Sequence, residues 1–138
     1  MVVCALIVAL IGALWAYFQI GIPQSVSYIA NLNPIAWSLW MFSIACLLAP
    51  SWCKFCLPLA LIGVSGLVMA AASPYYLTDD KILHYGGGTL FCLSASITGV
   101  MSCWWVVFFF LVMICANQKT WLFWVETACV LMLIGGLL

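Results

Sequence analysis

The longest apolar run in the chain extends from Lys81 to Ala116 and reads KILHYGGGTLFCLSASITGVMSCWWVVFFFLVMICA. As one α-helix these 36 residues would be about 54 Å long at about 1.5 Å per residue. The hydrocarbon core of a bilayer is only about 30 Å thick, so the run is too long for one crossing. Glycine, serine and two adjacent tryptophans between Gly99 and Trp105 indicate a tight turn at a membrane interface. The run therefore predicts two short helices, 81–99 and 105–116.

The composition requires apolar surroundings. Of the 138 residues, 69% are hydrophobic and 4% are charged, and the charges are three lysines, two aspartates and one glutamate. A soluble domain carries about a quarter charged residues, so these six side chains cannot solvate the outside of a globule. The composition excludes a cytosolic enzyme, a disordered tail and a nucleic-acid binder, which needs a basic face. It predicts an all-α integral membrane protein.

Turn-forming residues divide the rest of the chain into further spans. Prolines and asparagines in 21–34 indicate a loop, Pro50 indicates a helix end, and 117–120 is a polar turn. A signal peptide in place of the first span is disfavoured, because its amino end has no lysine or arginine. Residues 1–138 are therefore expected to form one compact bundle of six short transmembrane helices, at about 2–20, 35–49, 58–73, 81–99, 105–116 and 121–138.

A five-span alternative keeps Lys81 to Ala116 as one broken or tilted helix. Lys54 and Lys119 would then lie on one side of the membrane, as the positive-inside tendency prefers. The length of the run and the Trp104-Trp105 pair in its middle favour six spans. Three lysines are too few for a charge rule to outweigh that geometry.

In the six-span interpretation, three polar segments emerge on one side of the membrane, at 21–34, 74–81 and 117–120. The chain's single histidine follows an aspartate by four residues, which places both on one helix face. The one glutamate lies inside the last span, where an ionisable group costs about 2.5 to 3.5 kcal/mol and usually has a partner. These side chains predict a polar mouth suited to a lipid headgroup or a small polar ligand. The residues of this polar mouth are Ser25, Ser27, Asp80, His84 and Glu126.

Small residues at helical spacing indicate faces where helices approach closely. They are Gly63, Gly66 and Ala70 in the third span and Gly88, Ala95 and Gly99 in the fourth. Cys53 and Cys56 form a C-K-F-C motif, which is typical of a redox pair or half of a zinc site. No second such motif or histidine pair accompanies it, so we expect no metal and no cofactor.

Three short motifs follow one another in an order that resembles small uncharacterised polytopic membrane proteins of gut Bacteroidetes. More distantly, it is similar to the DRAM/Frag/Sfk-like six-span family. The motifs are Pro23-Gln24-Ser25-Val26-Ser27, the tryptophans Trp37 and Trp40, and Leu83-His84-Tyr85. The resemblance implies a multi-pass protein of the bacterial inner membrane with a role in membrane homeostasis or linked to lipid. It implies no established reaction.

Three functions compete. The leading one is a non-enzymatic membrane protein whose polar mouth binds a membrane lipid headgroup, or a partner such as another membrane protein or a second copy, in the extracytoplasmic leaflet. The second is an intramembrane lipid hydrolase with a bound metal, or with Ser25 or Ser27 as nucleophile, His84 as base and Asp80 orienting it. The third is a small transporter or channel subunit, although its polar residues gather at one end and no repeat of spans is visible.

Overall fold

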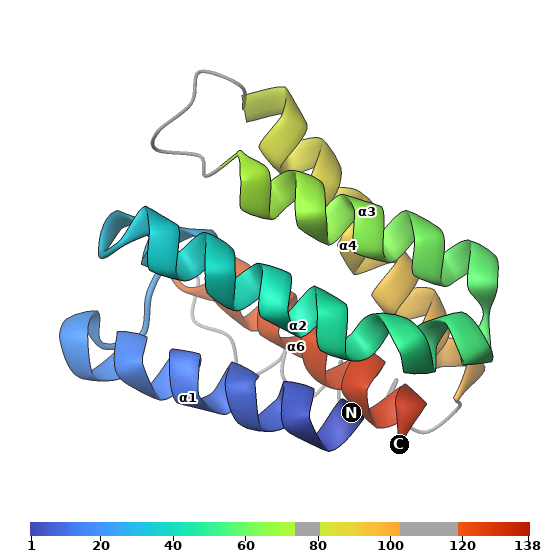
Figure 1. The fold of residues 1–138 in the computed structure, drawn as a ribbon. Coiled ribbons are helices and arrows are strands. Elements are labelled where there is room, and N and C mark those ends of the chain that lie inside the picture. The colour runs from blue at the N-terminus through green and yellow to red at the C-terminus, as the bar shows by residue number, and fades with distance from the viewer. Residues whose placement is uncertain (74–80, 103–118) are drawn as a thin grey trace.

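The computed structural model describes residues 1–73, 81–102 and 119–138, and within these ranges the chain is helical without strands. The all-helical fold class is therefore confirmed for the described part. The predicted fifth span, 105–116, and Asp80 of the polar mouth lie outside it. The elements, shown in Figure 1, are α1 (Val2–Ile20), the 3₁₀ helix η1 (Ser27–Asn31), α2 (Pro34–Phe55), α3 (Leu57–Ala72), α4 (Lys81–Met101) and α6 (Trp121–Leu137).

Local sequence signals explain where α1 ends and where α2 begins. The chain leaves α1 at Gly21, whose φ of 71° lies in the left-handed region that glycine adopts without a Cβ clash. Asn33 caps α2, because its side-chain oxygen accepts a hydrogen bond from the Ala36 amide at 3.0 Å. Pro34 occupies the first turn of α2, where its missing N–H costs little.

The second helix is longer than the sequence predicted. A helix end was expected at Pro50, with 51–57 as a connection, but α2 continues through Pro50 to Phe55. The connection is Cys56 alone, which has an extended backbone and ends α2 as it begins α3. Proline removes one helical hydrogen bond. Tertiary contacts of a residue that follows Pro50 compensate that loss.

Trp52, in the last turns of α2, is only 1% exposed. Its ring packs directly against Gly63 of α3, where any larger side chain would collide with the indole. Its Nε1–H donates to the Thr98 hydroxyl of α4 at 2.9 Å. The buried and hydrogen-bonded indole thus stabilises the turn of helix that follows the proline.

Helices α3 and α4 meet through their backbones. A methyl group added to Gly66 would lie 2.6 Å from the Gly87 carbonyl oxygen, and one added to Gly87 would lie 2.6 Å from the Gly66 carbonyl oxygen. The sequence predicted Gly88 for this face. The neighbouring Gly87 takes the position instead, and a Cβ on Gly88 would have no atom within 4 Å. One residue corresponds to about 100° around a helix, which turns Gly88 away from α3.

Helices α4 and α6 run side by side in the same direction, from left to right in Figure 1. Contacts show the register: the Ser96 hydroxyl lies 3.7 Å from the Cys129 sulfur, and the Ser102 hydroxyl donates to the Gly136 carbonyl at 3.3 Å. Between them, a methyl group on Gly99 would lie 2.7 Å from the Met132 side chain, and Ala95 is fully buried. Ser102 and Lys119, which flank the segment 103–118, therefore lie at opposite ends of the bundle.

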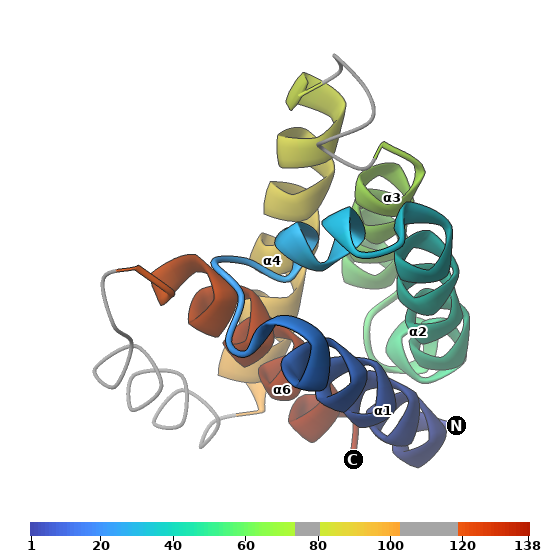
Figure 2. The ribbon, with the colours of Figure 1, turned by 90° about the vertical axis from the view of Figure 1, so that its left-hand side faces the viewer.

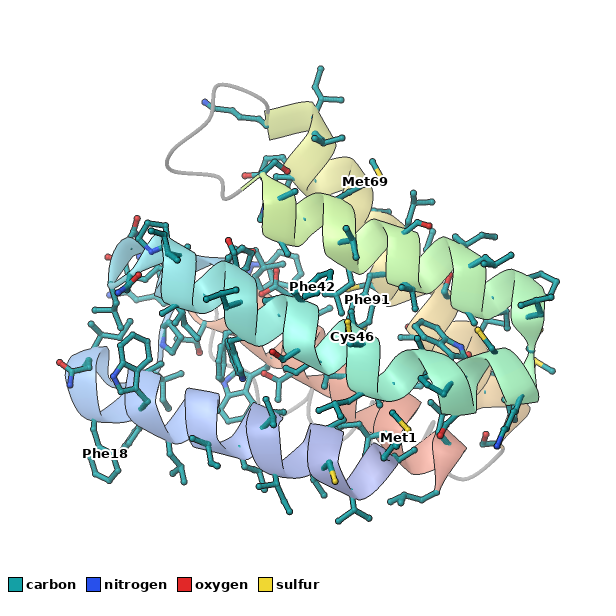
Figure 3. All side chains as sticks on the ribbon, viewed as in Figure 1. Met1, Phe18, Phe42, Cys46, Met69 and Phe91 are labelled. Atoms are coloured by element: carbon teal, nitrogen blue, oxygen red, sulfur yellow. The ribbon has the colours of Figure 1, made fainter. Side chains whose placement is uncertain are left out.

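Large apolar side chains cover much of the outer surface of the described helices. Phe18 is 78% exposed and points away from the neighbouring helices in Figure 3. By length and composition, α1 and α2 are suited to cross a membrane. Other exposed apolar side chains include Ile7, Ile11 and Leu14 of α1, Ile35, Leu39 and Phe42 of α2, Leu61 of α3, and Leu93, Ile97 and Val100 of α4.

The contact between α3 and α4 predicts different effects for two adjacent glycines. Gly87→Ala should lower the free energy of unfolding by about 1 to 3 kcal/mol, because its methyl group would meet backbone that cannot rotate away. Gly86→Ala should be neutral or slightly stabilising, because the space around Gly86 is open and alanine favours helix more than glycine. Thermal unfolding of both variants in detergent measures the difference, and equal stabilities would contradict the contact.

Candidate functional site

The polar residues lie at the end of the bundle where α1 and α3 end and where α2, α4 and α6 begin. Figure 2 looks onto this end, and η1 lies across it between α2, α4 and α6. The Ser25 hydroxyl accepts from the Tyr28 amide at 3.0 Å and so starts the turn of η1. The Trp37 ring of α2 donates to the Val26 carbonyl at 3.0 Å. The Ser25 hydroxyl thus shapes the turn into η1, and Trp37 ties the residue just before η1 to α2.

Glu126 joins this connector to α6. The Val26 amide donates to a Glu126 carboxylate oxygen at 2.6 Å, and the Ser27 amide also hydrogen-bonds to this carboxyl group. In return, the Phe123 amide, in the first turn of α6, donates to the Gln24 carbonyl at 3.1 Å. A carbonyl of the connector therefore accepts from an otherwise unpaired amide of the helix start, and the glutamate of that helix accepts from amides of the connector. Within the described residues, the partners of Glu126 are backbone amides rather than another side chain.

His84 joins α4 to α3 and to η1, and it is only 5% exposed. Its Nδ1 lies 2.8 Å from the Ser73 carbonyl oxygen and 3.2 Å from that of Ala70. Carbonyl oxygens only accept, so Nδ1 carries the proton and donates. In the neutral ring Nε2 is then an acceptor, and the Ser27 hydroxyl, 2.9 Å away, donates to it.

Four of the five residues of the predicted polar mouth share one surface. Ser25, Ser27, His84 and Glu126 all line a hollow of about 270 Å³, which we call the polar hollow. Asp80 lies outside the described residues. The sequence reasoning missed Gln24, Tyr85 and Leu122, which also line it. Gln24 and Tyr85 are sequence neighbours of Ser25 and His84, and Leu122 lies four residues before Glu126 on one helix face. These positions were the only available signal.

A second cavity, of about 350 Å³, adjoins the polar hollow along α4 and α6, and we call it the apolar cavity. The two share Ser27, His84, Tyr85, Leu122 and Glu126. Away from that shared rim, the lining is mostly hydrophobic. It includes Met41, Leu67, Phe91, Val125 and Val130. Gly88, which turns away from α3, also lines this cavity.

The described residues contain no group of three or more histidine, cysteine, aspartate or glutamate side chains placed to hold a metal ion. Cys53, in the last turn of α2, and Cys56, at the corner before α3, are both free thiols. A redox role for this pair stays a hypothesis.

Comparison with protein-family models, with curated proteins and with solved structures finds no match. The resemblance to six-span bacterial membrane proteins stays a prediction.

Glu126 should contribute to stability through its hydrogen bonds rather than through packing. Glu126→Leu leaves the Val26 and Ser27 amides without their acceptor, and we expect it to lower the free energy of unfolding by about 2 to 3 kcal/mol. Glu126→Gln keeps a carbonyl acceptor of similar shape but loses the charge, so its loss should be about 1 kcal/mol. Unfolding in detergent micelles measures both. A leucine variant as stable as the wild type would show that the carboxylate does not hold the connector.

Proposed function

We propose that the chain is a non-enzymatic, multi-pass integral membrane protein with six spans, and that its polar mouth binds a lipid headgroup in the extracytoplasmic leaflet of a bacterial inner membrane. The single observation that carries the proposal is the polar hollow at one end of the bundle, directly beside the apolar cavity.

Three features of the described helices support the membrane assignment. Two helices are long and apolar enough to cross a bilayer. Exposed large hydrophobic side chains occur on α1, α2, α3 and α4, whereas soluble monomers rarely expose extensive apolar surface. The parallel course of α4 and α6 favours six spans over five, because a single helix from Lys81 to Ala116 would make α6 antiparallel to α4.

The shape and chemistry of the site favour lipid over a protein partner. Ligand pockets for small molecules are concave and mostly apolar, with a few polar groups that fix orientation. The polar hollow and the apolar cavity together have this character, since His84, Ser27 and Glu126 stand at the rim they share. A lipid has the same division into a polar and an apolar part.

Lipid retention tests the proposal. We expect native mass spectrometry of the protein released from lipid nanodiscs to show bound lipid on the wild type. Ser27→Ala and Glu126→Gln should each reduce this retention about tenfold, the effect of one hydrogen bond to a charged or buried group. Ser43→Ala is the matched control, because its hydroxyl donates to the Leu39 carbonyl within α2 and is exposed. Equal retention by all four proteins would contradict a binding site at this end.

A second candidate, an intramembrane ester hydrolase, is favoured by one contact. The Ser27 hydroxyl donates to Nε2 of His84 at 2.9 Å, and the Ser73 carbonyl orients the ring through Nδ1. In such an enzyme the Ser27 oxygen would attack an ester carbonyl while Nε2 takes its proton and passes it to the leaving alcohol; water then hydrolyses the acyl-serine. Against this reading, the Val26 and Ser27 amides, the nearest candidates for an oxyanion hole, bond to Glu126.

A fluorophosphonate probe separates the two functions, because it labels only an activated serine. The proposed binding function predicts no labelling of the wild type at a probe concentration that labels a serine hydrolase in the same sample. Labelling of the wild type and of Ser43→Ala, but not of Ser27→Ala, would establish the hydrolase instead.

A further inference from the structure

Resting on the proposed function, we infer that the site takes one class of lipid: a single-chain amphiphile whose headgroup carries a primary ammonium group. The ammonium group would bind at Glu126 in the polar hollow, and the single acyl chain would lie in the apolar cavity, which residues of α2, α3, α4 and α6 line. A lysophosphatidylethanolamine has this chemistry.

The apolar cavity fits one acyl chain. Its volume of about 350 Å³ is near the lower end of the range for small-molecule pockets, about 300 to 1,000 Å³. The lining away from the rim is mostly hydrophobic, with Leu67, Phe91 and Val130 among its residues, and so it offers a chain the burial that drives apolar binding. A second acyl chain would have to remain outside this space.

The formal charge in the polar hollow is negative. The Ser27 hydroxyl lies 2.9 Å from Nε2 of His84, and Nδ1 of His84 donates to the Ser73 carbonyl. Among the described residues that line the hollow, only the Glu126 carboxylate carries a formal charge. It has about four lone-pair sites, of which the Val26 and Ser27 amides use two.

A headgroup that donates hydrogen bonds therefore suits this hollow. An ammonium group would form a charge-assisted hydrogen bond with the carboxylate, which is about twice as strong as a neutral one. A phosphate placed beside Glu126 would instead meet a like charge. The ammonium group therefore binds next to Glu126, and the lipid phosphate lies farther out toward the membrane surface.

Two glycines of α4 allow the binding of the acyl chain in the apolar cavity to be tested separately from the binding of the headgroup. Gly88 lines the apolar cavity, and a Cβ there would have no atom within 4 Å, so Gly88→Leu starts a side chain in open space at the wall of the cavity. Gly86 is equally open but does not line the apolar cavity, so Gly86→Leu is the matched control. Both changes replace glycine with a better helix former, which keeps folding comparable.

The experiment measures retention of defined probes by native mass spectrometry in detergent. The probes are lysophosphatidylethanolamine, lysophosphatidylglycerol, two-chain phosphatidylethanolamine and phosphoethanolamine. The wild type should retain the first about tenfold more than the second, the difference that one charge-assisted hydrogen bond makes. Glu126→Gln should remove this preference. Gly88→Leu should lose the single-chain lipid at least tenfold, while Gly86→Leu keeps it.

Several results would overturn the inference while leaving the proposed function intact. Equal retention of both single-chain lipids would refute the ammonium assignment, and stronger retention of the two-chain lipid would refute the single chain. Retention of phosphoethanolamine as strong as that of the lipid would show that the headgroup binds as a free solute. Equal retention of the single-chain lipid by Gly88→Leu and Gly86→Leu would refute the binding of the acyl chain in the apolar cavity. The proposed function itself falls if Ser27→Ala and Glu126→Gln retain every probe as the wild type does.

Discussion

The hydrogen bond from the Val26 amide to the Glu126 carboxylate, 2.6 Å long, is the contact on which the arrangement of this protein depends. It ties the connector after α1 to the beginning of α6, two parts of the chain that are 100 residues apart. An ionisable side chain among apolar helices is costly unless it is paired, and here loop amides that also needed an acceptor provide the pairing. Because the connector is held there, Ser27 lies against His84, and both cavities acquire their shared rim.

The direction of α6 follows from the same contact. With Glu126 at the end of the bundle where α4 begins, α6 runs parallel to α4, and small residues keep the two close along their length: Ala95 and Gly99 on α4, and Gly136 on α6. On its other side α4 meets α3 through Gly66 and Gly87. Helix α4 is therefore fixed between two neighbours. Gly88, which turns away from α3, is one of the α4 residues that line the apolar cavity.

Sequence patterns predicted the helices better than their contacts. Apolar runs bounded by turn residues placed α1, α4 and α6 within two residues of their observed ends. The prediction of a helix end at Pro50 was wrong. The helix beyond it is stabilised by the burial of Trp52, which no local pattern reveals. The sequence predicted Gly88 in place of Gly87 at the contact with α3, because three consecutive glycines do not show which of them faces the neighbouring helix. The amides that bond to Glu126 and the carbonyls that Nδ1 of His84 contacts are backbone groups, which every residue has, so residue types could not indicate them.

The most direct test of this account is the side of the membrane on which Lys54 and Lys119 lie. They mark the end of α2 and the residues just before α6, which are at opposite ends of the bundle. Lys54→Cys and Lys119→Cys, each made after replacement of the native cysteines, would be labelled in sealed vesicles with a thiol reagent that does not cross the membrane. The account predicts that only one of the two is labelled from outside. Labelling of both from the same side would contradict six spans and separate Glu126 from His84.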